Sequence, residues 1–279
     1  MSYKIILDSC GELTEEMLQS GNYSVVPLTL QVDDTVITDD ETFDQANFLR
    51  LVASTTACPK SACPSPEQYM SAYECGCDHI FVVTLSSQLS GSYNSAVLAK
   101  RLFEETNPAV NIHVFDSCSA SAGQTLLALK ADECERTNMD FENTVEEVKK
   151  YKSTLSTLFV LEDLSFLERN GRLTGLKKLT ANLLHIVPIM AGTREGTICQ
   201  LGQARGIKNA MSKLLDIIIS GCTENDVKKL VIAHCSCPER AEELKKKILE
   251  KIPTLTIYIN NTRGIASLYA GNKGIIVAY

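Results

Sequence analysis

Residues 80–106, IFVVTLSSQLSGSYNSAVLAKRLFEET, contain the features that decide the fold. The apolar run at residues 80–85 predicts a buried strand, a loop rich in hydroxyl groups follows it, and residues 90–106 have the apolar spacing of a helix. Strand and helix patterns also alternate before this segment, where residues 25–32 are predicted to form one strand, and after it, at residues 110–137. Such alternation is typical of βαβ units, so the first half of the chain is predicted to be α/β with a parallel sheet.

The second half of the chain follows a different pattern, which begins near Leu155. Two apolar runs at residues 186–190 and 197–202 predict an antiparallel hairpin, and strands and helices then alternate to the end of the chain. This order fits a mixed sheet. Because 279 residues favour two domains over one, we predict an N-terminal three-layer α/β/α domain at residues 1–160 and a C-terminal two-layer α/β domain with a mixed sheet at residues 161–279.

Composition and charge argue against several classes of function. The 34 acidic and 27 basic residues give a net charge of −7, which disfavours binding to a phosphate backbone, and no nucleic-acid partner is expected. The densest basic run, residues 245–247, lies among acidic residues and predicts i,i+4 ion pairs on an exposed helix.

The first residues lack the apolar stretch of a signal peptide, and no run reaches the roughly 18 apolar residues of a spanning helix. A cytoplasmic protein without stable membrane insertion is therefore expected.

The eleven cysteines are expected to be free thiols, because disulfides are rare in the cytoplasm and the number is odd. One residue separates Cys75 from Cys77, and one separates Cys235 from Cys237. Neighbouring zinc ligands are usually separated by about two to four residues. No metal site is predicted.

Two serine-containing loops are the candidate binding elements. In doubly wound folds, ligands lie beyond the carboxyl ends of the strands, and there Ser90 is predicted to be the N-cap of a helix whose start attracts anions. Gly91 lets a carboxylate or phosphate approach the backbone closely. The alternative is that Ser90 only caps its own helix. In a second, proline-rich loop at residues 58–66, Ser61 has no capping role and is available to face a ligand.

These loops and the motifs around them resemble those of the DegV family over essentially the whole chain. The serine-glycine block and the arginine-containing block that follows in the second half make the resemblance specific. The matching segments are Asp8-Ser9 and residues 59–65, 85–96, 114–117, 161–173, 188–189, 202–205 and 232–234.

The resemblance implies a two-domain protein that binds a long-chain fatty acid between its domains, with no cofactor. By motif position, the hydroxyl groups of Ser61 and Ser90 would hold the carboxylate. Arg169 matches a family arginine that would supply a countercharge or contact a partner, and the alternative is a surface arginine that ends a helix. Family members in bacteria serve as the fatty-acid-carrying subunit of a fatty acid kinase, whose separate ATP-binding subunit phosphorylates the carboxylate.

The chain departs from the family pattern near its C-terminus. Many members carry His-Thr-Gly-Pro-Gly where residues 260–264 of this chain read Asn-Asn-Thr-Arg-Gly. The missing histidine is predicted to weaken coupling to the kinase more than lipid binding, because a buried acyl chain gains its affinity mainly from apolar contact. His234 is interpreted as a structural hydrogen-bonding residue, and Arg172 as a residue that packs between the domains.

A serine hydrolase or acyltransferase is the alternative function, because a serine between a strand and a helix is also typical of a nucleophile elbow. That motif requires Gly-x-Ser-x-Gly, whereas Gln88 and Ser92 occupy the two glycine positions around Ser90. The sequence also lacks a P-loop and a GxGxxG motif, so no nucleotide binding is predicted. The preferred prediction is a lipid-binding carrier without catalytic activity of its own.

Overall fold

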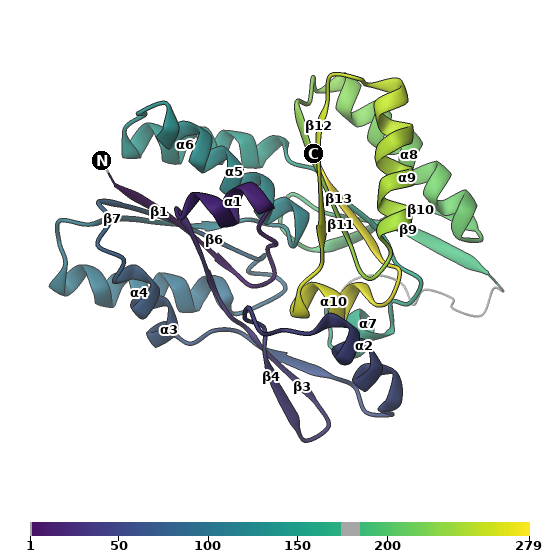
Figure 1. Ribbon diagram of the computed structural model, residues 1–279, viewed down its shortest axis with the longest axis horizontal. Coiled ribbons are helices and arrows are strands. Elements are labelled where there is room, and N and C mark those ends of the chain that lie inside the picture. Colours follow the sequence, from purple (N-terminus) through teal and green to yellow (C-terminus); the bar gives the residue numbers. More distant parts are fainter. Residues whose placement is uncertain (1, 174–184) are drawn as a thin grey trace.

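Two large sheets on either side of one helix form the centre of the protein (Figure 1). The computed structural model describes residues 2–173 and 185–279. Helix α5 (Ala122–Arg136) contacts strands of both sheets, and most of its residues are buried. Its small residues, among them Ala122, Gly123 and Ala128, allow both sheets to approach the helix closely.

The first sheet has four parallel strands in the order β2-β1-β6-β7. Its strands are β1 (Tyr3–Asp8), β2 (Tyr23–Val26), β6 (His79–Thr84) and β7 (Asn111–Asp116). Every residue of β6 is buried, as expected for a central strand covered on both faces. One face packs on α3 (Pro66–Tyr73) and α4 (Ser92–Thr106), and the other on α5. Helices α1 (Glu15–Ser20) and α6 (Phe141–Thr154) complete this half.

The second sheet has six strands in the order β10-β9-β8-β13-β11-β12. Only β11 and β12 pair in parallel, and the other pairs are antiparallel, which confirms the predicted mixed sheet. The strands are β8 (Thr157–Val160), β9 (Ile186–Gly192), β10 (Ile198–Arg205), β11 (Lys229–His234), β12 (Thr256–Asn261) and β13 (Ile275–Ala278). Strands β9 and β10 form the antiparallel hairpin that the two apolar runs predict.

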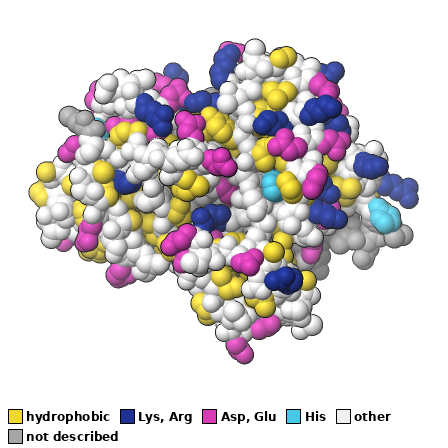
Figure 2. Space-filling view, viewed as in Figure 1, with side chains coloured by type: hydrophobic (Ala, Val, Ile, Leu, Met, Phe, Trp, Pro, Cys, Tyr) yellow, Lys and Arg dark blue, Asp and Glu magenta, His cyan; other side chains and the backbone are white. Residues whose placement is uncertain are grey.

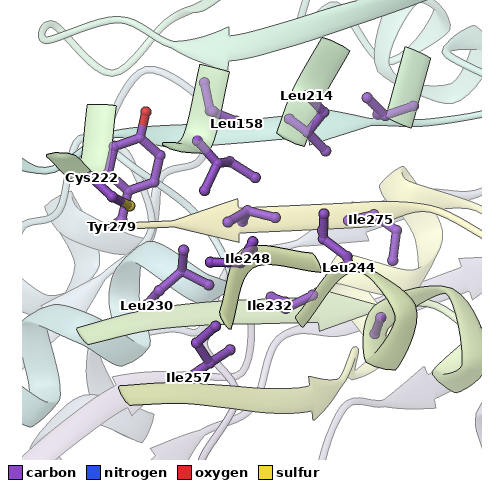
Figure 3. Packing of buried hydrophobic residues seen from close by; sticks show 14 of the residues in the cluster. Leu158, Leu214, Cys222, Leu230, Ile232, Leu244, Ile248, Ile257, Ile275 and Tyr279 are labelled. Carbon is purple, nitrogen blue, oxygen red and sulfur yellow. The ribbon is translucent and has the colours of Figure 1, made fainter. Parts of the chain in front are cut away.

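Helices α8 (Ile207–Glu224) and α9 (Pro238–Lys251) cover the outer face of the mixed sheet. Figure 3 shows Leu158 and Ile232 of the sheet close to Leu214 of α8 and Leu244 of α9, and all four are buried. The exposed face of α9 carries the ion pair Lys247–Glu243, with 2.6 Å between Nζ and Oε1, as the i,i+4 spacing predicts. In Figure 2, acidic and basic side chains are accordingly interspersed at the upper right.

A third, antiparallel sheet has the order β4-β3-β5 and lies against α2 (Gln45–Ser54) and α10 (Gly264–Ala270). Its strands are β3 (Thr29–Val32), β4 (Thr35–Thr38) and β5 (Lys60–Ala62). The prediction of one strand at residues 25–32 is therefore wrong. Pro27 has no N–H to donate to a strand ladder, and the chain passes there from the parallel sheet to the small sheet.

The α/β class with a parallel and a mixed sheet is confirmed. Strand β8, which ends at Val160, belongs to the mixed sheet, so this sheet begins before residue 161. The division of the chain at residues 160 and 161 stays a prediction. None of the helices in the described parts of the chain is long and apolar enough to cross a bilayer.

Candidate functional site

An apolar cavity lies where the two large sheets, α10 and the short helix α7 (Ser165–Arg169) meet. It has about 750 Å³ of atom-free space when its open end is included. Its walls come from segments far apart in the sequence. The lining residues are Cys10, Leu85, Leu89, Cys118, Ser119, Ala120, Ser121, Thr157, Phe159, Leu161, Leu167, Arg172, Gly192, Gly196, Thr197, Ile198, Ile265, Ala266, Tyr269, Ala270 and Ile276.

The alternation of side chains along β8 builds one long wall of this cavity. Thr157, Phe159 and Leu161 face the cavity, whereas Leu158 and Val160 belong to the core under α8 and α9. Successive residues of a strand point to opposite faces, so one apolar strand serves both the core and the cavity.

Leu89, Arg172 and Tyr269 line the cavity, whereas the predicted site residues Ser61 and Ser90 are not among its lining residues: Ser61 bonds to Tyr269, and Ser90 follows Leu89 in the chain. We call the group formed by these five residues the mouth. The Ser61 and Tyr269 hydroxyl groups are hydrogen-bonded at 3.0 Å between oxygens. The Arg172 guanidinium lies 5.8 Å from the centroid of the Tyr269 ring, within the range of a cation–π contact. Arg172 Nε donates to the carbonyl oxygen of Leu89 at 3.2 Å. The mouth therefore joins β5, α10 and the loop that contains Ser90.

Ser61 lies in a strand and not in a loop, which corrects the expectation from the surrounding prolines. It is half-buried in β5, where it pairs with Leu30 of β3. The three-residue strand is short because Pro59 and Pro64 flank it, and proline cannot contribute an N–H to the ladder.

The prediction that Ser90 is the N-cap of its helix is also wrong. Helix α4 begins at Ser92 with Gly91 as N-cap, because the backbone N–H of Ser90 already closes a turn to the Ser86 carbonyl at 3.1 Å. The Ser90 hydroxyl accepts a hydrogen bond from the backbone N–H of Ser92 at 3.2 Å, so it still lies at the start of α4. A Cβ atom on Gly91 would lie 3.1 Å from Cys63 Sγ. The two serine segments are thus in contact.

A buried carboxylate holds the Ser90 loop in place. Asp8, at the end of β1, accepts hydrogen bonds from the Leu85 backbone N–H at 2.8 Å, the Ser92 hydroxyl at 2.6 Å and the Gln124 side-chain amide at 2.8 Å. Burial raises the pKa of Asp8, and the hydrogen bond from Ser92 opposes that rise. Asp8 therefore ties α4 and α5 to the carboxyl edge of the parallel sheet.

The two arginines of the family block occupy different positions. Arg169 is exposed at the end of α7 and does not line the cavity. Arg172 is half-buried and does line it, and its Nη1 also donates to the carbonyl oxygen of Asn170. The sequence predicts only a packing role for Arg172, and no motif in it indicates Tyr269.

Residues 260–264, which differ from the family pattern, lead directly into α10. Asp39 accepts hydrogen bonds from the backbone N–H groups of Gly264 at 2.7 Å and Ile265 at 2.9 Å. This contact fixes the start of α10, and Tyr269 is carried on the same helix.

His234 lies at the end of β11 and accepts a hydrogen bond from the Cys237 backbone N–H at 3.4 Å, which agrees with a structural role.

All eleven cysteines are free thiols. Within residues 2–173 and 185–279, no cluster of three or more His, Cys, Asp or Glu side chains has an arrangement that would hold a metal ion.

Comparisons with known proteins agree with this architecture. The family model of the DegV family matches residues 2–279. A DegV domain-containing protein of Streptococcus pyogenes is 35% identical over 286 residues, covering 100% of this chain and 99% of the relative. The structure of a DegV family protein from Ruminococcus gnavus, refined with vaccenic acid, is 48% identical with a TM-score of 0.96 and covers 100% of both chains. The fatty acid kinase (Fak) B3 protein of Streptococcus pneumoniae, loaded with linoleic acid, is 34% identical with a TM-score of 0.91, covering 100% of this chain and 99% of that one.

Proposed function

The chain belongs to the DegV family, and from this premise we propose that it buries one long-chain fatty acid in the cavity between its two large sheets. The observation that carries the proposal is the distribution of polarity, because the cavity is apolar along its length and its charged group lies at the mouth. A carboxylic acid with a long alkyl chain has the same distribution. Each buried CH₂ contributes about 0.8 kcal/mol, so some 15 methylenes give about 12 kcal/mol before the cost of immobilising the chain.

We place the carboxylate of the fatty acid at the mouth, between Ser61, Ser90 and Arg172. A guanidinium has five N–H donors, and those of Arg172 that bond to Leu89 and Asn170 leave others for a ligand. Charge-assisted hydrogen bonds from a guanidinium and two hydroxyl groups suit a carboxylate. Gly91, the N-cap of α4, lets Cys63 of the other serine segment pack closely against the start of this helix.

We assign the exposed Arg169 to contact with a partner and not with the ligand. The partner is an ATP-binding fatty acid kinase subunit. The protein presents the carboxylate of its bound fatty acid to this subunit for phosphorylation. The eleven free thiols support a reducing compartment, and we place the protein in the cytoplasm.

In this proposal the protein is a carrier without catalytic activity of its own. Serine hydrolysis requires a base at the nucleophile. Within the described residues, the Ser61 hydroxyl bonds to Tyr269 and the Ser90 hydroxyl to the Ser92 amide, and no histidine bonds to either. The geometry therefore gives the hydrolase alternative no support.

The ligand can be tested by extracting the purified protein with organic solvent and analysing the extract by mass spectrometry. We expect stoichiometric long-chain fatty acid. After delipidation, palmitate should raise the melting temperature more than methyl palmitate, which has the same chain but no carboxylate. An extract without fatty acid, together with no thermal shift by palmitate or oleate, would contradict the proposal. Turnover of an activated acyl ester would instead favour the hydrolase.

A further inference from the structure

Asn170 ends helix α7 and is turned toward the protein. It is the C-cap of this helix, and its backbone N–H donates to the Phe166 carbonyl oxygen at 3.1 Å. Asn170 is half-buried, whereas Glu168 and Arg169 directly before it are exposed. A partly buried amide side chain needs hydrogen-bond partners, and those of Asn170 lie beside two groups of the mouth.

The side-chain amide of Asn170 joins α7 to the segment that precedes Ser61. Nδ2 donates to the Phe166 carbonyl oxygen at 3.0 Å and to the Pro59 carbonyl oxygen at 3.1 Å, and Cys58 Sγ lies 3.4 Å away. Carbonyl oxygens only accept, so the amide nitrogen and not its oxygen faces them. Pro59 is buried and immediately precedes β5, in which Ser61 is the second residue.

The backbone carbonyl of Asn170 holds the guanidinium of Arg172. This carbonyl oxygen accepts from Arg172 Nη1 across Gly171, whose φ of +74° is a left-handed conformation that glycine adopts without strain. The Arg172 backbone N–H then donates to the Leu167 carbonyl oxygen of α7 at 2.8 Å. Asn170 thus contacts the chain next to Ser61 through its side chain and the Arg172 guanidinium through its backbone.

We propose that Asn170 is a positioning residue that sets the Ser61 hydroxyl relative to the Arg172 guanidinium, so that both groups reach one carboxylate. The inference rests on the proposed fatty-acid function and deepens it by naming a residue that acts through Ser61 and is not among the lining residues of the cavity. Strand β5 has only three residues and pairs only with β3, so the bond to Pro59 adds a restraint from outside this sheet. Precise placement matters because hydrogen bonds weaken steeply when their geometry is poor.

The test measures dissociation constants for palmitate and methyl palmitate. Asn170→Ala removes the amide and should weaken palmitate binding about twofold to about tenfold, the effect of one lost hydrogen bond. Binding of methyl palmitate should weaken less, because the ester has no carboxylate to align. Asn170→Leu, which keeps most of the side-chain volume but has no donor, should behave in the same way.

Asn225→Ala is the matched control. Asn225 is the C-cap of α8, and its Nδ2 donates to the Gly221 carbonyl oxygen at 2.8 Å, four residues back, as Asn170 does to Phe166. Asn225 is exposed and does not line the cavity. The control therefore loses the same kind of helix cap and should keep the affinities of the unaltered protein for both ligands.

A double-mutant cycle separates positioning from a general effect on stability. In a Ser61→Ala background the hydroxyl that Asn170 positions is absent, so Asn170→Ala should lower palmitate affinity little further, whereas a role independent of Ser61 would give the same loss in both backgrounds. The ratio of affinities for the acid and the ester does not depend on how much protein is folded, so partial unfolding of a variant does not mimic the expected result.

Three outcomes overturn the inference while the proposed function stands. They are unchanged palmitate affinity in both Asn170 variants, equal losses for the acid and the ester, and the same loss with and without the Ser61 hydroxyl. If the unaltered protein binds neither palmitate nor oleate, the proposed function fails, and the inference fails with it.

Discussion

The hydroxyl groups of Ser61 and Tyr269 are 3.0 Å apart although the two residues are 208 positions apart in the sequence. This hydrogen bond connects the small sheet to α10 at the mouth of the cavity. It also orients the Ser61 hydroxyl relative to the guanidinium of Arg172, which lies over the Tyr269 ring.

We predict that Tyr269→Phe weakens fatty-acid binding while the protein remains folded. The change removes one neutral hydrogen bond, worth about 0.5–1.5 kcal/mol, so the dissociation constant for palmitate should rise about twofold to about tenfold. Tyr258→Phe, on β12 and away from the cavity lining, is the matched control. Equal affinities in the two variants would show that Tyr269 does not orient the site.

Ser90→Ala should weaken binding more than Ser61→Ala. Both variants lose a hydroxyl, but Ser90 lies at the start of α4, where the helix dipole strengthens a bond to an anion. Losing a hydrogen bond to a charged group costs about 1.5–3 kcal/mol, or about tenfold to about a hundredfold in affinity. Titration of Ser87→Ala, a change in the same loop, provides the comparison. A Ser90→Ala protein with unaltered affinity would contradict the carboxylate assignment.

The two arginines should have separable roles. Arg172→Gln removes the charge at the mouth and should reduce affinity for palmitate by about 1.5–3 kcal/mol, whereas Arg169→Gln should bind palmitate normally. Phosphorylation of the bound acid by a fatty acid kinase subunit should instead slow with Arg169→Gln. Loss of lipid binding in Arg169→Gln would place this exposed residue at the ligand after all.

Much of the fold could be predicted because local patterns determine it. The apolar residues of the strand at residues 80–85 are all buried, whereas in the hairpin Ile189, Met190 and Ile198 are buried and Leu201 is exposed. Helix α6 was not predicted, although Asp140 caps it and its apolar residues Val145 and Val148 have helical spacing. Its many charged residues made this signal weak. The break between β2 and β3 also has a local signal, because Pro27 cannot donate to a strand ladder.

The site could be predicted only in part. The sequence offers Ser61 and Ser90 as candidates because each lies in a short motif with its own backbone constraints, and their role at the carboxylate stays a prediction. No local pattern relates Arg172, which follows α7, to Tyr269 of α10, because only tertiary packing brings the two residues together.

The buried carboxyl group of Glu12 predicts a pH dependence of stability. Burial raises its pKa from 4.5 to about 8, and the hydrogen bond from the Ser121 hydroxyl only partly opposes this. Between these two values the folded protein keeps a proton that the unfolded chain has released, so stability should fall as pH rises through this window and level off above it. Asp8 and Asp39 are also buried with raised pKa values and act in the same direction.

Glu12→Gln isolates the contribution of this one group, because glutamine cannot ionise and still offers an oxygen to Ser121. We expect the variant to gain stability relative to the unaltered protein as the pH is raised from about 5 to about 9, and the difference should stop growing above the raised pKa. Urea denaturation midpoints measured across this range give the comparison. Glu105→Gln, an exposed position on α4, should show no such trend. A constant difference between the Glu12→Gln variant and the unaltered protein at every pH would mean that Glu12 is ionised in the folded protein throughout, and that the Ser121 hydroxyl and its surroundings compensate fully for its burial.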